Sequence, residues 1–195
     1  VIEVSSFQLM HIDKFHPHIS VLLDISRDHL DWHQSFSDYV NSKKRLFDNQ
    51  TENDWAVVFG KNSLTVEMAS HCDARKIYFD VNCLDTLLPH LHKDGSVIVQ
   101  HEHDRTTPVA SLESFSLLGQ HNQSNALAAT AVSTLMGISQ EQIEGVFAQF
   151  SGLPHTLEKV QEIEGIHFYN DSKATNIQAV KAALASFDSP IVLIL

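Results

Sequence analysis

Cysteine and positive charge are both scarce in this sequence of 195 residues. Its two cysteines, Cys72 and Cys83, lack metal-ligand spacing, so the chain is predicted to be reduced and intracellular, with a single disulfide as the open alternative. Lys and Arg number 13 against 24 Asp and Glu, which gives a formal net charge of −11. Nucleic acids and anionic membranes select clustered basic residues, so this balance argues against both as partners.

Long apolar runs are also missing. No run approaches the roughly 20 residues needed to cross a bilayer, and the start lacks the charged and then apolar layout of a signal peptide. We therefore expect a cytoplasmic protein without membrane insertion. The phosphate-loop pattern G-x-x-x-x-G-K-S/T does not occur either. Because the chain starts without Met and stops within an apolar run at 190–195, we expect a fragment.

Apolar runs alternate with amphipathic segments over the first half of the chain, which predicts an α/β fold with a mostly parallel sheet and flanking helices. Strands are expected at 1–4, 19–25, 55–59 and 75–79, and helices at 35–49 and 63–70. Segment 81–118 alternates polar and apolar residues around Asp94-Gly95, which favours a small antiparallel part.

The second half begins with two helices, expected at 122–136 and from Ser139 to Phe150. A hairpin of strands 158–163 and 166–169, a helix at 175–186 and a strand at 190–195 should follow. The pattern therefore predicts a domain boundary near residue 151, with one domain at 1–150 and the start of a second α/β unit at 151–195.

Lys43 is the sharpest single candidate for chemistry. Helical spacing places it in line with Phe36, Val40 and Phe47, and so toward the sheet. A desolvated lysine has a lowered pKa, and its neutral amine can act as a base or capture carbon dioxide as a carbamate. The alternative is a lysine whose stem is buried and whose charge stays in water.

Glu3 and His29 are candidate partners of Lys43. Glu3 falls within the first predicted strand, where a buried carboxylate needs a partner or a cation. His29 follows the second predicted strand at the carboxyl end, where open α/β sheets bind ligands, although a structural histidine is the alternative. Together with a carbamylated Lys43, the two side chains would offer Mg²⁺ a mainly oxygen ligand set.

Histidine is abundant, with 13 copies, some of them with the spacing His-x-His. His16 with His18 and His101 with His103 suggest zinc, because neighbouring imidazoles suit that ion. No third ligand is patterned near either pair, so we interpret all four as surface histidines. A histidine-rich metal-binding protein remains one alternative function.

Three polar clusters at 119–125, 152–156 and 170–176 each lie beside an expected helix start or turn. They look like parts of one site for a phosphorylated ligand. Asp171, Lys173 and Thr175 follow a strand and precede a helix, a geometry that binds anions through backbone N–H groups. The alternative is that Asp171 or Thr175 is a plain helix cap.

Six motifs, taken together in this order and spacing, closely resemble the Mur ligases nearly from end to end. They are Glu3-Val4-Ser5-Ser6-Phe7-Gln8-Leu9, Asp28-His29-Leu30-Asp31, the run 39–43, His121-Asn122-x-x-Asn125-Ala126, Gly152-Leu153-Pro154-His155 and the run 170–176. The resemblance implies a three-domain enzyme of peptidoglycan synthesis. Residues 1–150 would be most of its central ATPase domain and 151–195 the start of its Rossmann-like C-terminal domain.

The resemblance is strongest to the family member that adds D-glutamate to UDP-N-acetylmuramoyl-L-alanine. It implies ATP and Mg²⁺ as cofactors, an acyl-phosphate intermediate attacked by the amine, and a monomer when full length. The uridine-binding domain and phosphate loop would lie upstream, so this chain alone is expected to be inactive. The alternatives are another Mur ligase, a folylpolyglutamate synthase-like ligase, or an inactive fragment that only binds ligand weakly.

The resemblance also assigns residues. Glu3 and His29 match Mg²⁺ ligands, and Lys43 matches the lysine whose carbamate supports a second metal ion. The remaining matches concern substrates: Ser5 and Gln8 lie near the muramoyl group, Asn122 and Asn125 at the nucleotide base, Asp171 near its ribose, and Lys173 and Thr175 at the reacting groups. One position departs: Thr156 stands where the family usually has an arginine that contacts ATP phosphate.

Overall fold

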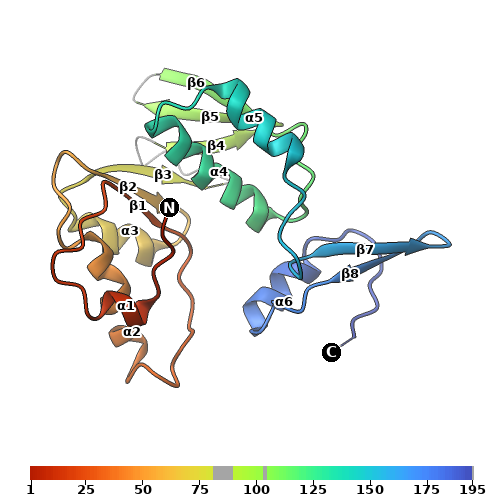
Figure 1. The fold of residues 1–195 in the computed structure, drawn as a ribbon, viewed down its shortest axis with the longest axis horizontal. Helices are drawn as coiled ribbons and strands as arrows, with labels where there is room; N and C mark the ends of the chain where they lie inside the picture. Colours follow the sequence, from red (N-terminus) through yellow and green to blue (C-terminus); the bar gives the residue numbers. More distant parts are fainter. Residues whose placement is uncertain (81–89, 103–104, 195) are drawn as a thin grey trace.

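The computed structural model describes residues 1–80, 90–102 and 105–194. Within them the main sheet has six strands in the order β1-β2-β3-β4-β5-β6 (Figure 1). Neighbours from β1 to β4 are parallel, and β5 and β6 are antiparallel to the strands before them. The strands are β1 (Ile19–Leu22), β2 (Trp55–Phe59), β3 (Arg75–Phe79), β4 (His90–Asp94), β5 (Val97–Glu102) and β6 (Arg105–Ser111).

Helices cover both faces of this sheet, and the pleat of β2 shows why. Val57 packs into a core with helices α4 and α5, whereas Ala56 and Val58 pack on the opposite face with α2 and α3. All three side chains are fully buried, as expected for a central parallel strand. The α/β class with a mostly parallel sheet is therefore confirmed. The helices are α2 (Phe36–Lys44), α3 (Ser63–Ser70), α4 (Gln120–Leu135) and α5 (Gln140–Gln149).

The antiparallel region expected at 81–118 is present as β4, β5 and β6, and β4 and β5 meet at the turn around Gly95. Residues 81–89, which include Cys83, and residue His103 lie outside the described chain. No described helix is long and apolar enough to cross a membrane.

The strand expected at 1–4 is wrong. These residues belong to no strand, and Val1 and Ile2 are exposed. A short apolar run becomes a strand only where a neighbour completes its hydrogen bonds, and no described segment pairs with this one. The chain instead forms a short helix, α1 (Ser6–Leu9), that the sequence did not predict.

The C-terminal part forms a separate lobe in Figure 1. Strands β7 (Glu158–Ile163) and β8 (Ile166–Asn170) make the expected hairpin, whose turn residues Glu164 and Gly165 both have positive φ, the conformation of a type I′ turn. Helix α6 (Ile177–Leu184) follows. The strand expected at 190–195 is wrong for 190–194, which pair with no described strand, and residue 195 is outside the described chain.

The two lobes touch at Gly119, which precedes α4. Gly119 has φ +91°, and a Cβ built there would overlap Ser186 after α6 and lie 2.7 Å from the His121 ring. A Cβ on Gly152 would lie 3.1 Å from Leu117. The start of α4 therefore lies against the C-terminal lobe, and only glycine fits at position 119.

Candidate functional site

Aromatic rings gather between α1, the loop after β1 and α2. The Phe7 ring lies 5.1 Å from His29, 5.3 Å from Trp32 and 5.7 Å from His33, measured between centroids. His29 has φ 54°, a left-handed conformation that turns the chain after the strand. Its side chain is half exposed, so this edge of the sheet is open to ligands.

Lys43 belongs to the same group. Its Nζ lies 6.0 Å from the centroid of the Tyr39 ring, and the residue is half-buried, as the helical stripe predicted. Burial lowers the pKa of Lys43, and the carboxylates of Glu3 and Asp28 partly oppose that shift. Burial also raises the pKa of Tyr39, with a further increase from Asp28. Glu3, Asp28 and Lys43 are thus electrostatic neighbours.

The expected burial of Glu3 is wrong, because the residue is exposed. It lies outside any strand, so its carboxylate needs no buried partner. The Glu3 carboxylate still raises the pKa of Lys43, so Glu3 lies near the lysine with which the sequence analysis grouped it. Glu3, Asp28 and His29 carry side chains of the kinds that bind Mg²⁺, but among the described residues their ligand atoms do not all lie within 4.8 Å of one another.

Ser5 and Gln8 form the capping box of α1. The Ser5 amide and hydroxyl donate to the Gln8 side-chain oxygen at 2.9 and 3.1 Å, and the Gln8 amide donates to Ser5 Oγ at 3.2 Å. These reciprocal bonds stabilise an otherwise very short helix. Gln8 is exposed.

His33 is a buried residue at this site that the sequence reasoning missed. Its side chain is fully buried, with Nε2 2.9 Å from Ser6 Oγ and Nδ1 3.3 Å from an Asp38 carboxylate oxygen. It therefore fastens α1 to the start of α2, which sets Phe7 against His29. In the sequence, the available signal was the position of His33, four residues after His29 and two residues before the Ser35 cap.

Asn122 and Asn125 lie in the first turns of α4. The Asn122 Nδ2 donates to the Leu118 carbonyl at 2.8 Å, which leaves its side-chain oxygen and second N–H for a ligand. Asn125 is exposed. Burial lowers the pKa of the neighbouring His121, and the Asp171 carboxylate partly opposes this. Asp171 is therefore close to the start of α4.

The loops 152–157 and 170–176 are joined by hydrogen bonds. The Leu157 amide donates to Asp171 Oδ1 at 3.0 Å, the Lys173 amide donates to the His155 carbonyl at 3.1 Å, and Asn170 Nδ2 lies 2.9 Å from His155 Nδ1. His155 and Leu157 both have positive φ. The two loops consequently form one continuous surface of the C-terminal lobe.

Lys173 and Thr175 have exposed side chains on this surface. Neither Asp171 nor Thr175 caps α6, because Asn176 does so by accepting from the Ala179 amide at 2.9 Å. The capping alternative is therefore wrong. Within the described residues, no hydrogen bond or ion pair joins this surface to the group around Lys43, so the structure brings the predicted residues together as two clusters.

Comparison with known proteins places most of the chain in one family. Residues 1–133 match the family description "Mur ligase middle domain". A UDP-N-acetylmuramoylalanine–D-glutamate ligase from Geobacillus kaustophilus is 43% identical over the whole chain, and one from Natranaerobius thermophilus is 40% identical over 99% of it. The chain spans about two-fifths of these relatives, 42% and 41% of their lengths.

Solved structures agree on the fold. MurF from Acinetobacter baumannii is 20% identical and superposes with a TM-score of 0.64, covering 85% of this chain and 36% of that one. MurF from Thermotoga maritima, solved in complex with ADP, is 18% identical with a TM-score of 0.61, covering 88% and 40%. From the match over 1–133 and these relatives, the chain belongs to the Mur ligase family.

Proposed function

We propose that the protein is the ligase that joins D-glutamate to UDP-N-acetylmuramoyl-L-alanine with hydrolysis of ATP. The observation that carries this proposal is identity of 36–43% across the whole chain with relatives that bear this name. The comparisons do not support a folylpolyglutamate synthase. We also propose that residues 1–150 belong to the central domain and 151–195 to the C-terminal one, and that the protein works as a cytoplasmic monomer.

Lys43 is the residue whose environment bears most directly on the mechanism. A lowered pKa increases the fraction of neutral amine at a given pH, and only that form attacks carbon dioxide. The nitrogen then forms a bond to carbon and releases one proton, which leaves a carbamate anion in place of an ammonium cation. Near the carboxylates of Glu3 and Asp28, this change replaces a cation by a further anionic oxygen ligand and so favours the binding of a metal cation.

Mg²⁺, held by Glu3, His29 and the Lys43 carbamate, would offset the negative charge of the ATP phosphates and of the group being transferred. The residues of this chain contribute by holding the side chains of the proposed site in position. His33 fixes α1 on α2, so Phe7 faces His29. Ser5 and Gln8, at the start of α1, would orient the muramoyl substrate beside this site.

The nucleotide end of the proposed site lies between the lobes. Asn122 and Asn125 provide amide groups that suit the edge of a base, and the Asp171 carboxylate suits the ribose hydroxyls. The exposed Lys173 and Thr175 would contact the reacting groups. The electrostatic contact between Asp171 and His121 supports placing these residues at one nucleotide.

The test is phosphate release by the complete protein with ATP, Mg²⁺ and UDP-N-acetylmuramoyl-L-alanine. We expect release to require D-glutamate and to fail with L-glutamate or meso-diaminopimelate. Turnover with diaminopimelate in place of D-glutamate would reassign the substrate to another Mur ligase. The 195-residue chain alone should show no turnover, since it spans only 42% of its relative.

Lys43→Ala is the matching variant, with Lys44→Ala as the control. We expect Lys43→Ala to lower kcat by at least about 100-fold, because it removes a group that organises transition-state charge. A short carboxylate such as formate should restore part of the activity by supplying the missing oxygens. Equal activity of the two variants would contradict the proposed role.

A further inference from the structure

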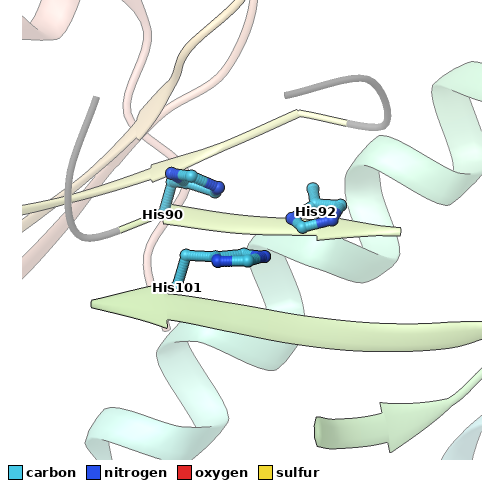
Figure 2. A group of neighbouring side chains, drawn as sticks. All are labelled: His90, His92 and His101. Atoms are coloured by element: carbon cyan, nitrogen blue, oxygen red, sulfur yellow. The ribbon is translucent and has the colours of Figure 1, made fainter. Parts of the chain in front are cut away.

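Three histidines meet on the antiparallel part of the main sheet (Figure 2). His90 and His92 are two residues apart on β4 and so face the same side. His101 is the cross-strand partner of His90 on β5. The intervening Leu91 packs into the core with α4, so the histidines lie on the other face.

The three rings are close enough to share one ion. One ligand nitrogen from each lies within 4.8 Å of the others. Ring centroids are 4.9 Å apart for His90 and His101, 4.6 Å for His92 and His101, and 5.4 Å for His90 and His92. Tetrahedral zinc with Zn–N bonds of about 2.0–2.1 Å needs nitrogens about 3.3 Å apart. Turning the rings about χ2, a broad torsion for histidine, can supply this closure.

The hydroxyl of Thr106 can fix the tautomer of one of the three rings, that of His101. The Nδ1 atom of His101 lies 2.9 Å from Thr106 Oγ1 across the β5–β6 ladder. When Nδ1–H donates to that oxygen, Nε2 carries the lone pair and is free to bind a metal. Metal-binding histidines commonly make such a bond through the second nitrogen, which fixes the tautomer and the ring orientation.

From this geometry we propose that His90, His92 and His101 form a binding site for a divalent transition metal ion, foremost Zn²⁺. Imidazole nitrogen is a ligand of choice for zinc, whereas Mg²⁺ prefers oxygen. The site is therefore chemically distinct from the proposed Mg²⁺ site at Glu3, His29 and Lys43. A metal ion held here would join β4 to β5 and leave a fourth position for water.

His90 and His92 also have the spacing His-x-His, but spacing alone does not show that they lie beside His101, because the ligands come from two strands. The pair His101 and His103 suggested zinc but offered no third ligand, and His103 lies outside the described residues. The ligands that complete the group come from β4, through the antiparallel register of His90 with His101. A spacing search along one strand does not reveal a pairing across two.

The test is calorimetric titration of the metal-free complete protein with ZnCl₂ in excess Mg²⁺, which keeps oxygen-rich sites filled. We expect one tightly bound Zn²⁺ that raises the thermal midpoint. His92→Gln and His101→Gln should each weaken Zn²⁺ binding by at least about 100-fold, more than the loss of an outer-shell partner. His71→Gln, at the exposed end of α3, should change nothing. We do not include a variant of His90, because this residue is buried.

Two further variants sharpen the test. Thr106→Val should weaken Zn²⁺ binding by about 10-fold, since Thr106 is exposed and acts only through His101, whereas Thr107→Val, which faces the other side of β6, should not. Co²⁺ should give visible absorption bands that are lost in His92→Gln. Absence of a stoichiometric Zn²⁺, or loss of it in His29→Gln but not in His92→Gln, would overturn the proposal. Ligase activity plays no part in these readouts.

Discussion

At the scale of single residues, Lys43 should titrate below the ordinary lysine value of 10.5. Its charged form is disfavoured by burial, so the folded protein binds fewer protons there than the unfolded chain. Stability should therefore rise with pH between the folded pKa of Lys43 and 10.5. Nζ-detected NMR of lysine-labelled protein, kept free of carbon dioxide, measures the titration directly.

Glu3→Gln provides the matched control for Lys43. The Glu3 carboxylate raises the pKa of Lys43, so its removal should lower that pKa further. A titration that is unchanged in Glu3→Gln would show that the two side chains are not neighbours, and would remove the support for a joint Mg²⁺ site.

Thr156 is the second residue with a sharp expectation. It is half-buried in the loop that binds Asp171, and its amide donates to the Leu153 carbonyl at 3.2 Å. In the complete protein, Thr156→Arg should lower the apparent KM for ATP by about 10-fold, because a charge-assisted contact to phosphate contributes about 1.5–3 kcal/mol. Thr156→Gln, which adds length without charge, should leave KM as it is. Equal constants for both would rule out an arginine subsite here.

At the scale of elements, the junction between α4 and the C-terminal lobe depends on Gly119. At Gly119, φ is positive and an added Cβ would overlap Ser186. At Gly137, which follows α4, φ is also positive, +76°, but an added Cβ would meet nothing within 4 Å. We expect Gly137→Ala to cost about 1 kcal/mol from backbone strain alone, and Gly119→Ala to cost at least about 1 kcal/mol more. Urea unfolding of both variants gives the difference. Equal losses would mean that the lobes do not meet at Gly119.

Elements whose residues carry their own signal were predictable from the sequence. Ser35 caps α2 by accepting from the Asp38 amide at 3.1 Å, and the apolar spacing predicted the burial of Tyr39 and Phe47. Strands β2 and β3 also match, since both are buried on two faces. Segments 1–4 and 190–194 look similar as apolar runs, but a strand also needs a neighbour, and this requirement is not local.

The candidate site was predictable to a similar extent. The polar residues of the loops at 152–157 and 170–176 predicted that these loops belong to a site. The hydrogen bonds between the two loops, however, depend on the β7–β8 hairpin, which brings them together. The burial of His33 and the exposure of Glu3 depend on how α1 docks on α2. Such contacts are set by packing between elements, which residue spacing alone does not encode.

At the scale of the whole molecule, Asp54 should govern part of the acid stability. Its buried carboxylate lies 2.6 Å from His16 Nε2 and 3.1 Å from His18 Nδ1, and accepts from the Thr51 amide at 2.8 Å. The hydrogen bond with His16, followed by those from Thr51 and His18, holds the pKa of Asp54 far below its usual 3.8. It thereby ties the segment before β1 to the turn before β2.

The sign of the Asp54 effect follows from the lowered pKa. The stabilisation is complete above the unfolded value of 3.8 and is lost as pH falls toward the folded value. Asp54→Asn should thus be less stable than wild type at pH 7, with the gap narrowing below about pH 4. Asp48→Asn, which removes an exposed pair with Arg45, should differ little at any pH. Urea midpoints measured from pH 7 to pH 3 would show a constant gap if Asp54 were not linked to folding.

The segment between α5 and β7, residues 150–157, has a consequence for how the proposed ligase responds to ATP. It joins the end of α5 by a short stretch of chain to the β7–β8 hairpin that leads into Asp171. A short tether gives the second half of a divided site an effective concentration in the millimolar range. Two contacts that are weak alone can therefore act as one strong receptor. Cleavage within 150–157 would make ATP affinity depend on protein concentration.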